Sequence, residues 1–302
     1  MKKNLILSII LVILLALAAA YQYWYLPRVN NSTQENNFLA KIDIVKADKI
    51  VIKRGEIETT LIKEGDRFKV QAPGEWYVNK LVAQTMIQSW QTAASGTVFL
   101  VSHNKDAKPE FKTDGGLVVK IFQGNNQQGA WVLGLTRAGY TYISHVGSDD
   151  TYEVQGNLRS AFDYQEWRDF AIWPPATGAF TALKISRGKD VLQLQKQGAD
   201  WFLSGDKKTK LKLDKLNQVL ALMSDLSASS IADAKETDNG LASSQFKIEA
   251  SGQGINRLLL IGKERKDKSA SEVYVKTNQN NNVYLIRTQE RDIFNLSLKD
   301  LR

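Results

Sequence analysis

The sequence repeats itself at a spacing of about 132 residues, and no other feature constrains the fold as strongly. The stretch NNVYLIRTQERDIF, residues 281–294, aligns with DDTYEVQGNLRSAF, residues 149–162. Five more pairs align in the same order at similar spacings: IVIKRG with LKISRG, GDRFKV with GADWFL, NKLVAQTMIQSW with DKLNQVLALMSD, GAWVLG with RLLLIG, and YTYIS with EVYVK. Collinear self-similarity indicates a duplicated structural unit. The sequence therefore predicts two copies of one fold.

Each copy is predicted to open with three strands and a helix. Apolar and polar residues alternate in KIVIKRGEIETTLIKEGDRFKV and again in ALKISRGKDVLQLQKQGADWFLS, which is typical of half-buried strands joined by short turns. Asn79 and Asp214 then stand where a helix N-cap is expected. The apolar residues behind them share one helical face: Val82, Met86, Trp90 and Ala93 in the first copy, and Leu216, Val219, Leu220, Met223 and Leu226 in the second.

Four further strands and a short helix complete each copy. The strands are LVVKIF, AWVLG, YTYIS and TYEV in the first copy, and FKIEA, RLLLIG, EVYVK and NVYLI in the second. We therefore predict an α+β chain, with an N-terminal transmembrane helix followed by two tandem repeats of antiparallel sheet, each with one long and one short helix. The repeats are expected at residues 46–172 and 181–302. A hinge at residues 173–180 separates them, because WPPATG interrupts regular structure.

Residues 1–28 are predicted to form a short cytoplasmic stub and a membrane anchor. The run from Leu5 to Ala20 is almost wholly apolar and is followed directly by four aromatic residues within 21–25. Aromatic rings favour the headgroup level, so residues 5–25 together reach the ~20 residues of a spanning helix. Lys2 and Lys3 then keep the N-terminus in the cytoplasm. The expected localisation is the inner (cytoplasmic) membrane, single-pass, with the bulk of the chain in the periplasm.

A cleaved signal peptide is the alternative for the same segment. ALAAA offers small residues at a signal-peptidase site, but the bulky aromatic cluster directly after it favours an anchor. Both interpretations export the chain. Residues 29–45 follow as a polar, asparagine-rich linker of a composition typical of flexible connections.

Bulk composition excludes several classes of function. The chain has no cysteine, which rules out disulfides, thiol catalysis and thiolate metal sites. Its formal net charge is +8, but lysine and arginine are scattered and form no arginine-rich arm, so no nucleic-acid partner is predicted. No cofactor motif is present, since GNNQQG (124–129) joins two strands and lacks the ending of a phosphate-binding loop.

One segment of the second copy resembles a known family. Gly240-Leu241, the later LLLIGKE and EVYVKTNQNNNVYLI, and the predicted N-terminal anchor are similar to the bacterial family catalogued as domain of unknown function 4340. The resemblance extends over about residues 45–302, although Ala-Ser-Ser follows Gly240-Leu241 where the family tends to have a proline nearby. It implies an envelope-facing accessory protein, since some relatives resemble auxiliary components of ABC-type export systems, including those of gliding motility. It implies no catalytic residues.

Two histidines invite a catalytic interpretation. His103 and His145 each lie near a serine and an aspartate. A working triad needs a nucleophile on a strained turn and an oxyanion hole, and the sequence has no G-x-S-x-G. The second copy has no histidine, so the fold does not require one. The two histidines are also far apart, without the paired spacing of metal ligands, and no metal site is predicted.

Two charged clusters remain open to a functional or a structural interpretation. GSDDTYE (147–153) offers oxygen ligands for a cation, but the equivalent NQNNNVY is uncharged, which favours a hairpin turn. GKERKDKSAS (262–271) offers a phosphate contact, but a solvated loop between two strands is the preferred interpretation. The acids and other polar groups do not repeat between the copies, whereas the packing residues do.

Aromatic residues divide into repeated and unrepeated sets. Phe68, Trp201, Tyr152, Tyr284, Phe162 and Phe294 recur at matched places, which indicates core packing. The unrepeated Trp76, Trp167 and Trp173 are expected to be exposed and are the candidate interaction surface for a peptide or a sugar.

The functional hypothesis is a non-enzymatic, membrane-anchored periplasmic protein that acts as an accessory or binding module of an ABC-type transport system. Its cleft or open sheet edges would bind a partner by strand addition or groove docking. The alternative is a module that binds envelope glycan or peptide, or a hydrolase of such polymers. A hydrolase would need His103 or His145 in a pocket together with a carboxylate and a nucleophile.

Overall fold

The computed structural model describes Leu14 and residues 33–302, apart from residues 75, 177, 207, 208, 210, 234 and 267–270. The predicted anchor at residues 5–25 lies outside the described residues, except for Leu14. Within the described residues no helix is both long enough and apolar enough to cross a membrane. The anchor therefore stays a prediction.

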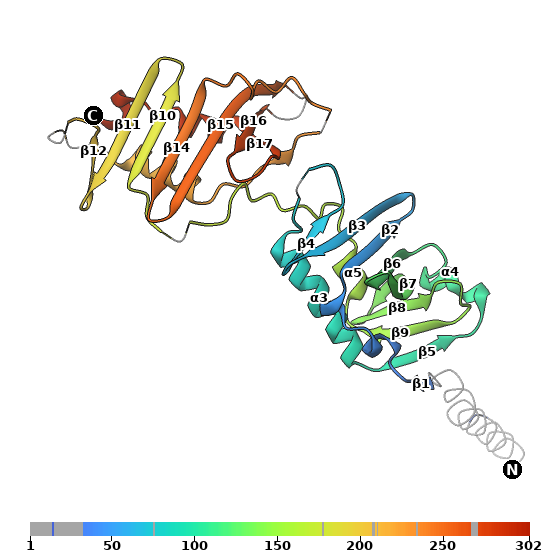
Figure 1. Cartoon of the computed structure of the whole chain (residues 1–302). Helices are drawn as coiled ribbons and strands as arrows, with labels where there is room; N and C mark the ends of the chain where they lie inside the picture. The colour runs from blue at the N-terminus through green and yellow to red at the C-terminus, as the bar shows by residue number, and fades with distance from the viewer. Residues whose placement is uncertain are drawn as a thin grey trace, which may run out of the picture. The chain divides into compact units, whose positions relative to one another are not determined.

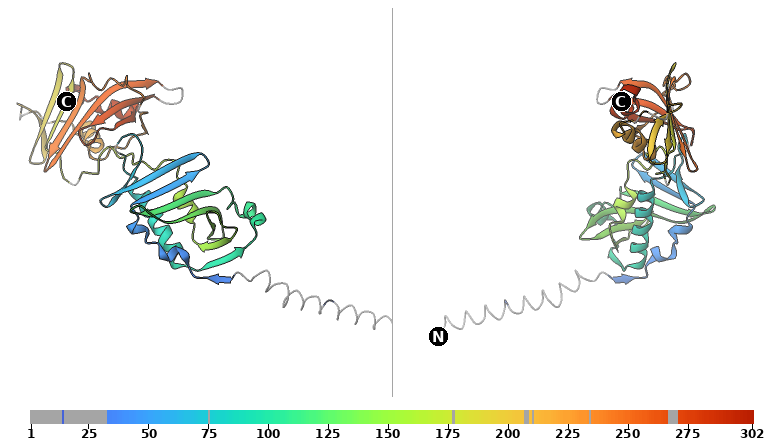
Figure 2. Two further views of the ribbon diagram at one scale, coloured as in Figure 1. Left: turned by 45° about the vertical axis from the view of Figure 1, so that its right-hand side comes forward. Right: turned by 90° about the vertical axis from the view of Figure 1, so that its left-hand side faces the viewer.

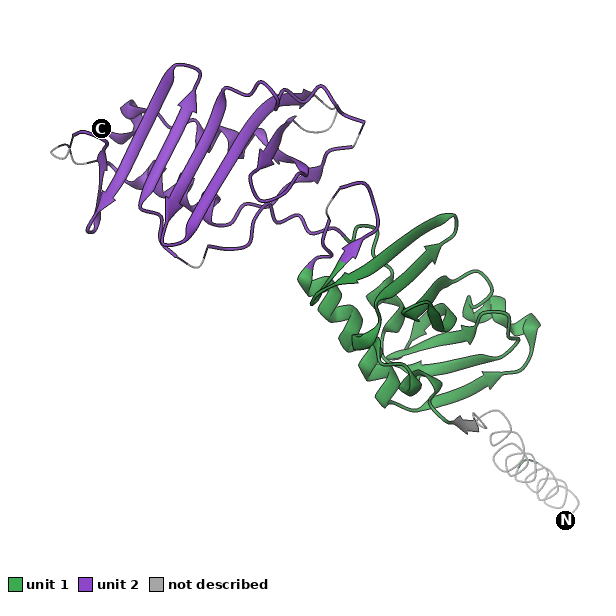
Figure 3. Cartoon of the chain, in the orientation of Figure 1, with its two compact units in different colours: residues 1–68, 80–167 green, residues 69–79, 168–302 purple. Residues whose placement is uncertain are grey.

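The chain forms two compact units (Figure 3). The first contains the described residues up to Phe68 and Lys80–Trp167, and the second contains Lys69–Asn79 and Arg168–Arg302. Residues 69–79 thus belong to the second unit, although the repeat pattern places them within the first copy. The repeat boundaries at 172 and 181 remain a prediction of the alignment.

The first unit is built on a nine-stranded antiparallel sheet (Figure 1). The alternating segments predicted from the sequence form its strands, and each tight turn between β2 and β4 has a glycine at positive φ, Gly55 and Gly65. In sheet order the strands are β1 (Thr33–Glu35), β5 (Val98–Ser102), β9 (Thr151–Gln155), β8 (Tyr140–His145), β7 (Asn126–Arg137), β6 (Leu117–Gln123), β2 (Lys49–Arg54), β3 (Ile57–Glu64) and β4 (Arg67–Val70). The last two residues of β4 are assigned to the second unit.

The helices α3 (Lys80–Ser95) and α5 (Leu158–Phe162) lie on one face of this sheet (Figures 1 and 2). Trp90, on the long helix, meets Trp131 of β7 edge-on at a centroid distance of 5.1 Å and Phe162 at 6.2 Å. Three of the four residues predicted for the buried face of this helix, Met86, Trp90 and Ala93, are buried. The helices are α3 (Lys80–Ser95), α4 (Lys108–Phe111) and α5 (Leu158–Phe162), with 3-10 turns at Phe38–Lys41, Ile44–Lys46 and Lys105–Ala107.

The second unit has an eight-stranded antiparallel sheet. Its strand order matches eight of the nine strands of the first sheet, and only β1 lacks a counterpart. In sheet order the strands are β12 (Asp200–Leu203), β11 (Asp190–Gln197), β10 (Ala182–Arg187), β14 (Phe246–Gly252), β15 (Ile255–Lys266), β16 (Ser271–Thr277), β17 (Val283–Arg287) and β13 (Ser230–Ile231). The prediction of two antiparallel sheets with a few helices is confirmed, and the described chain is mostly β.

The helices α6 (Asp214–Ser224) and α7 (Thr288–Phe294) lie on one face of the second sheet (Figure 2), and a 3-10 turn at Leu298–Leu301 follows. Leu216, Val219 and Met223 of α6 are buried in the core that these helices form with the sheet. Phe294, which ends α7, is also buried there. Asp214 is the first residue of α6 and not its cap, because Leu213 occupies the cap position without a side-chain hydrogen bond.

Candidate functional site

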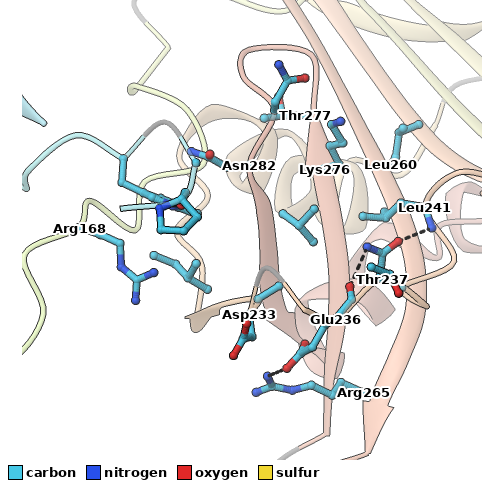
Figure 4. A pocket seen from close by; sticks show the side chains of 18 of the residues that line it. Arg168, Asp233, Glu236, Thr237, Leu241, Leu260, Arg265, Lys276, Thr277 and Asn282 are labelled. Carbon is cyan, nitrogen blue, oxygen red and sulfur yellow. Dashed lines mark hydrogen bonds and ion pairs between the residues drawn. The ribbon is translucent and has the colours of Figure 1, made fainter. Parts of the chain in front are cut away.

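A groove of about 1070 Å³ opens on the second unit (Figure 4). All of its lining residues belong to that unit, including Pro73 and Trp76 from segment 69–79. A smaller cavity of about 230 Å³ lies between α6, α7 and the C-terminal turn. The groove is slightly larger than the roughly 300–1,000 Å³ typical of ligand pockets, and we take it as the candidate site.

The floor of the groove is the sheet face turned away from α6 and α7. Successive strand residues point to opposite faces, so Val273 and Val275 of β16 enter the main core while Tyr274 between them points the other way. Tyr274 packs with Leu241 and Leu285 in a separate buried cluster. Leu260, Val283 and Ala232 pack against that cluster and also line the groove, which gives the floor an aliphatic surface.

The segment between β13 and β14 is fixed on this face by a backbone contact at a β-bulge. The register of β15 against β16 shifts between Ile261 and Glu264, and there the amide of Lys263 donates to the carbonyl of Asn239 at 2.8 Å. Gly240 follows with a φ of +71°. A Cβ atom on Gly262 would lie 2.3 Å from the Asn239 carbonyl oxygen. The turn that presents Leu241 to the groove therefore requires glycine at position 262.

The Gly262→Ala variant is expected to be less stable than the native chain by roughly 1–3 kcal/mol, since overpacking a closed contact forces the backbone to move. Denaturant unfolding followed by circular dichroism measures the change. Gly115→Ala is the control, because a Cβ atom there would meet nothing within 4 Å. Equal stability of the two variants would show that segment 232–245 is not held at the bulge.

A partly buried ionic network borders the groove. Arg265 of β15 donates to Glu272 of β16 at 2.5 Å and to Glu236 of the loop at 3.3 Å. Glu236 also accepts a hydrogen bond of 2.5 Å from the Tyr274 hydroxyl. The second carboxylate oxygen of Glu272 accepts from the hydroxyls of Ser229 and Ser230 at 2.7 and 2.9 Å. Each carboxylate is thus hydrogen-bonded several times, as buried charges require.

The network shifts the pKa of its members. Burial raises the pKa of Tyr274 to about 12, and the hydrogen bond to Glu236 adds to this effect. Burial alone would raise the pKa of Glu272, but the hydrogen bonds from Ser229, Ser230 and Arg265 together outweigh it and lower the pKa. At neutral pH Glu272 is therefore ionised and Tyr274 is protonated. With two carboxylates and one guanidinium, the network forms a wall of hydrogen-bonded polar groups with one formal negative charge in excess.

Other residues that line the groove supply cationic and polar groups. Lys276 of β16 lines the groove and forms no ion pair with any described residue. The Arg168 guanidinium lies over the Trp76 ring at 5.5 Å. Asn281 and Thr277 also line the groove and add polar groups. The site therefore combines an aliphatic floor with a few polar and cationic groups at its edges, an arrangement typical of binding pockets.

Comparison with known proteins places the chain in a family. The family model described as "Domain of unknown function (DUF4340)" matches residues 69–244, more than half of the chain. The chain belongs to this family. No curated protein and no solved structure matches it.

The region matched by the DUF4340 model contributes two walls of the groove. It begins at Lys69, the first residue of the second compact unit, and ends at Ser244, just before β14. It thus includes segment 69–79 and the loop with Gly240-Leu241, whereas β15, β16 and β17 lie beyond it. The Gly240-Leu241 pair, which suggested the family, directly follows Asn239, whose carbonyl accepts the hydrogen bond from Lys263 at the bulge of β15.

The expectation that Trp76, Trp167 and Trp173 are exposed is wrong. Trp76 is 5% exposed, packs edge-on against Tyr284 at 5.3 Å and donates from Nε1 to the Pro73 carbonyl. Trp173 is 2% exposed, with the Arg257 guanidinium 5.1 Å from its ring. Trp167 is 2% exposed and packs against Tyr164 in the first unit. Their unrepeated positions reflect local packing, and only Trp76 borders the groove.

The two histidines lie away from both cavities. His103 Nδ1 donates a 2.7 Å hydrogen bond to the Asp150 carboxylate, and its side chain is 76% exposed. That is its one hydrogen bond within the described part of the chain. His145 is half-buried against Phe38, and burial lowers its pKa, partly offset by Asp150. A nucleophile, a carboxylate and a histidine therefore do not converge in either cavity.

The charged clusters singled out in the sequence lie outside the groove apart from Arg265. The first half of GSDDTYE lies in the turn between β8 and β9, and its second half begins β9 at Thr151. No group of three metal-ligating side chains occurs among the described residues. GKERKDKSAS is not simply a loop, because its first half continues β15 to Lys266. Residues 267–270 lie outside the described residues.

Sequence reasoning missed most residues of the groove. Glu236, Arg265 and Lys276 lie on three separate segments, and nothing in their spacing indicates that they meet. The glycine of Gly240-Leu241 was the one local signal, since a glycine after a polar run indicates a special backbone conformation.

Proposed function

We propose that this protein is a non-catalytic binding module, held at the outer face of the cytoplasmic membrane by residues 5–25, that acts as an accessory of an ABC-type transport system. The observation that carries the binding role is the groove of the second unit, with its aliphatic floor of Leu260 and Val283 beside Lys276, which has no ion-pair partner among the described residues. The family resemblance and the apolar N-terminal run support the location and the kind of partner.

A binding role fits the chemistry of the groove better than catalysis does. General acid–base catalysis needs a group whose pKa lies near the working pH. Glu236 and Glu272 are instead engaged by Arg265, and the pKa of Tyr274 is raised to about 12. Their hydrogen bonds are made within the protein, which leaves the aliphatic floor and Lys276 to contact a ligand.

A protein segment is preferred to an envelope glycan as the ligand. Sugar recognition commonly uses an open aromatic face for stacking. Among the described residues Trp76 is the one indole that lines the groove, and it is almost fully buried, with Arg168 over its ring. The aliphatic floor suits leucine-like or valine-like side chains, and Lys276 offers a positive charge to a carboxylate.

Affinity purification of the full chain from detergent-solubilised membranes tests this proposal. The native chain is expected to retain the permease or ATPase subunits of an ABC-type transporter, identified by mass spectrometry. Lys276→Glu reverses the unpaired charge in the groove and is expected to reduce that recovery at least tenfold, about 1.4 kcal/mol.

Lys189→Glu is the matched control, since Lys189 is an exposed residue in the turn between β10 and β11 and does not line the groove. It should leave the recovery unchanged. If no transport protein is recovered with the native chain, the accessory role is wrong. If the recovery persists with Lys276→Glu, the groove is not the binding site. Loss of recovery with both variants would mean that charge alone, and not the groove, decides the association.

A further inference from the structure

The first sheet has one strand more than the second, because β1 covers the outer edge of β5. β1 pairs antiparallel with β5, with Thr33 opposite Leu100 and Glu35 opposite Val98. In the second sheet β13 occupies the place of β5, beside β17. No described strand pairs with the other side of β13. The same position is therefore filled in one copy of the fold and open in the other.

The open side of β13 faces the groove. Ile231 of β13 and the next two residues, Ala232 and Asp233, line it. An exposed strand edge presents unpaired N–H and C=O groups and is a template for pairing with another chain. The groove thus offers an aliphatic floor and backbone hydrogen-bonding groups at the same place.

The chain just before β13 already has an antiparallel neighbour. Ala171 bridges Ser227, the amide of Ala228 donates to the Phe170 carbonyl at 2.7 Å, and the amide of Ile172 donates to the Leu226 carbonyl at 2.9 Å. This neighbouring segment leaves the edge at Arg168, which instead bridges Val78. Arg168 itself lines the groove. The antiparallel pairing of residues 170–172 with residues 226–228 therefore does not continue along β13.

We propose that an extended peptide segment of a partner protein completes this ladder by pairing with β13 in the groove, in the place that β1 takes beside β5. The inference rests on the proposed binding function and specifies its mode. Backbone hydrogen bonds to the strand edge provide affinity, and pockets for alternate side chains provide specificity. Every second side chain of the peptide lies over the sheet face that carries Ala232 and Val283, so aliphatic residues are expected at alternate positions.

A library of random linear dodecapeptides, selected on the full chain in lipid nanodiscs, supplies the probe. The selected peptides are expected to share aliphatic residues at alternate positions and to bind in a fluorescence-polarisation titration. N-methylation removes one backbone donor at a time. In an antiparallel pair, alternate residues direct their backbone groups to the partner strand. Within the part of the peptide that pairs with β13, N-methylation is therefore expected to weaken binding about tenfold at alternate positions and little between them.

Blocking the edge provides the second measurement. The chain has no cysteine, so a single cysteine can carry a bulky polyethylene-glycol maleimide. Asp233→Cys carrying this label is expected to abolish peptide binding. Asp200→Cys, labelled in the same way, is the control, because Asp200 is an exposed aspartate on β12 at the opposite edge of the same sheet. It should bind the peptides as the unlabelled chain does.

Three results would overturn the proposal. They are the absence of any selected peptide that binds, a sensitivity to N-methylation without a period of two, and equal effects of the labels at positions 233 and 200. Self-association of the native chain that the label at 233 abolishes would assign the edge to a second copy and would also overturn it. If transport subunits are still recovered through the groove while the peptide tests fail, the binding function stands and strand addition does not.

Discussion

Replacement of Trp76 by alanine is expected to lower the free energy of unfolding of the second unit by about 3–5 kcal/mol, the range for removing a large aromatic side chain from a core. Trp76 belongs to the main core of this unit, although it lies some ninety residues before Arg168, where the rest of the unit begins. The variant loses the edge-on contact with Tyr284, the hydrogen bond to Pro73 and the surface under Arg168.

Thermal and urea unfolding of the purified full chain measure this loss. Trp76→Phe keeps a ring against Tyr284 and is expected to recover part of the stability. Val191→Ala is the surface control in the same unit, since Val191 is 56% exposed, and it should change the stability by no more than about 0.5 kcal/mol. A Trp76→Ala variant as stable as the Val191→Ala control would show that segment 69–79 is not part of the second unit.

The second large effect is expected from Glu272→Gln. Glu272 is buried, and its carboxylate accepts hydrogen bonds from Arg265, Ser229 and Ser230. Neutralising it leaves the Arg265 guanidinium, whose Nε is buried without a hydrogen-bond partner among the described residues, with only the longer contact to Glu236. Removing one partner of a buried ion pair typically costs about 3–5 kcal/mol, and about 3 kcal/mol is expected here because Arg265 is partly exposed.

The effect of Glu272→Gln depends on pH in a defined direction. The pKa of Glu272 is lower in the folded protein than its usual value near 4.5. Its ionised form therefore stabilises the fold above the unfolded-state pKa, and this contribution is lost as the pH falls through the folded-state pKa. The difference in unfolding free energy between the native chain and the variant should be full at pH 7 and should shrink below about pH 4.5.

Glu249→Gln is the matched control for the ion pair. Glu249 pairs with Lys184 at 3.0 Å, but both side chains are nearly half exposed. An exposed pair of this kind contributes about 0–1 kcal/mol. A Glu272→Gln variant that lost no more than this, or whose loss did not depend on pH, would mean that the buried network does not hold the loop against β15.

The sheets were predictable because their signals are local. Alternating runs such as KIVIKRG and LKISRG form strands in nearly the predicted places, and the collinear repeat indicated that the two sheets share their order. The cap of α6 was misplaced by one residue because Asp214 begins the helix. The extra strand β1 was not foreseen, because Thr33–Glu35 lies in a stretch whose composition indicates a linker.

The groove was not predictable, because its walls come from distant segments. Pro73 and Ile231 lie more than 150 residues apart, and no repeat relates them. The burial of Trp76 misled the prediction for a related reason. Trp76 packs into a unit that is formed mainly by later residues, so it has no counterpart in the other copy. The absence of a matching tryptophan was therefore interpreted as a sign of surface exposure.

Site-specific photo-crosslinking in intact membranes tests the central claim, binding at the open edge of β13, most directly. A benzophenone amino acid at position 233, on the rim of the groove, is expected to crosslink to a discrete partner, and mass spectrometry of the linked peptide should find it in an extended segment of a transport protein. The same amino acid at position 200, on β12 at the other edge of the sheet, should give no such product. Crosslinking of the same partner from both positions, or from position 200 alone, would contradict binding at β13.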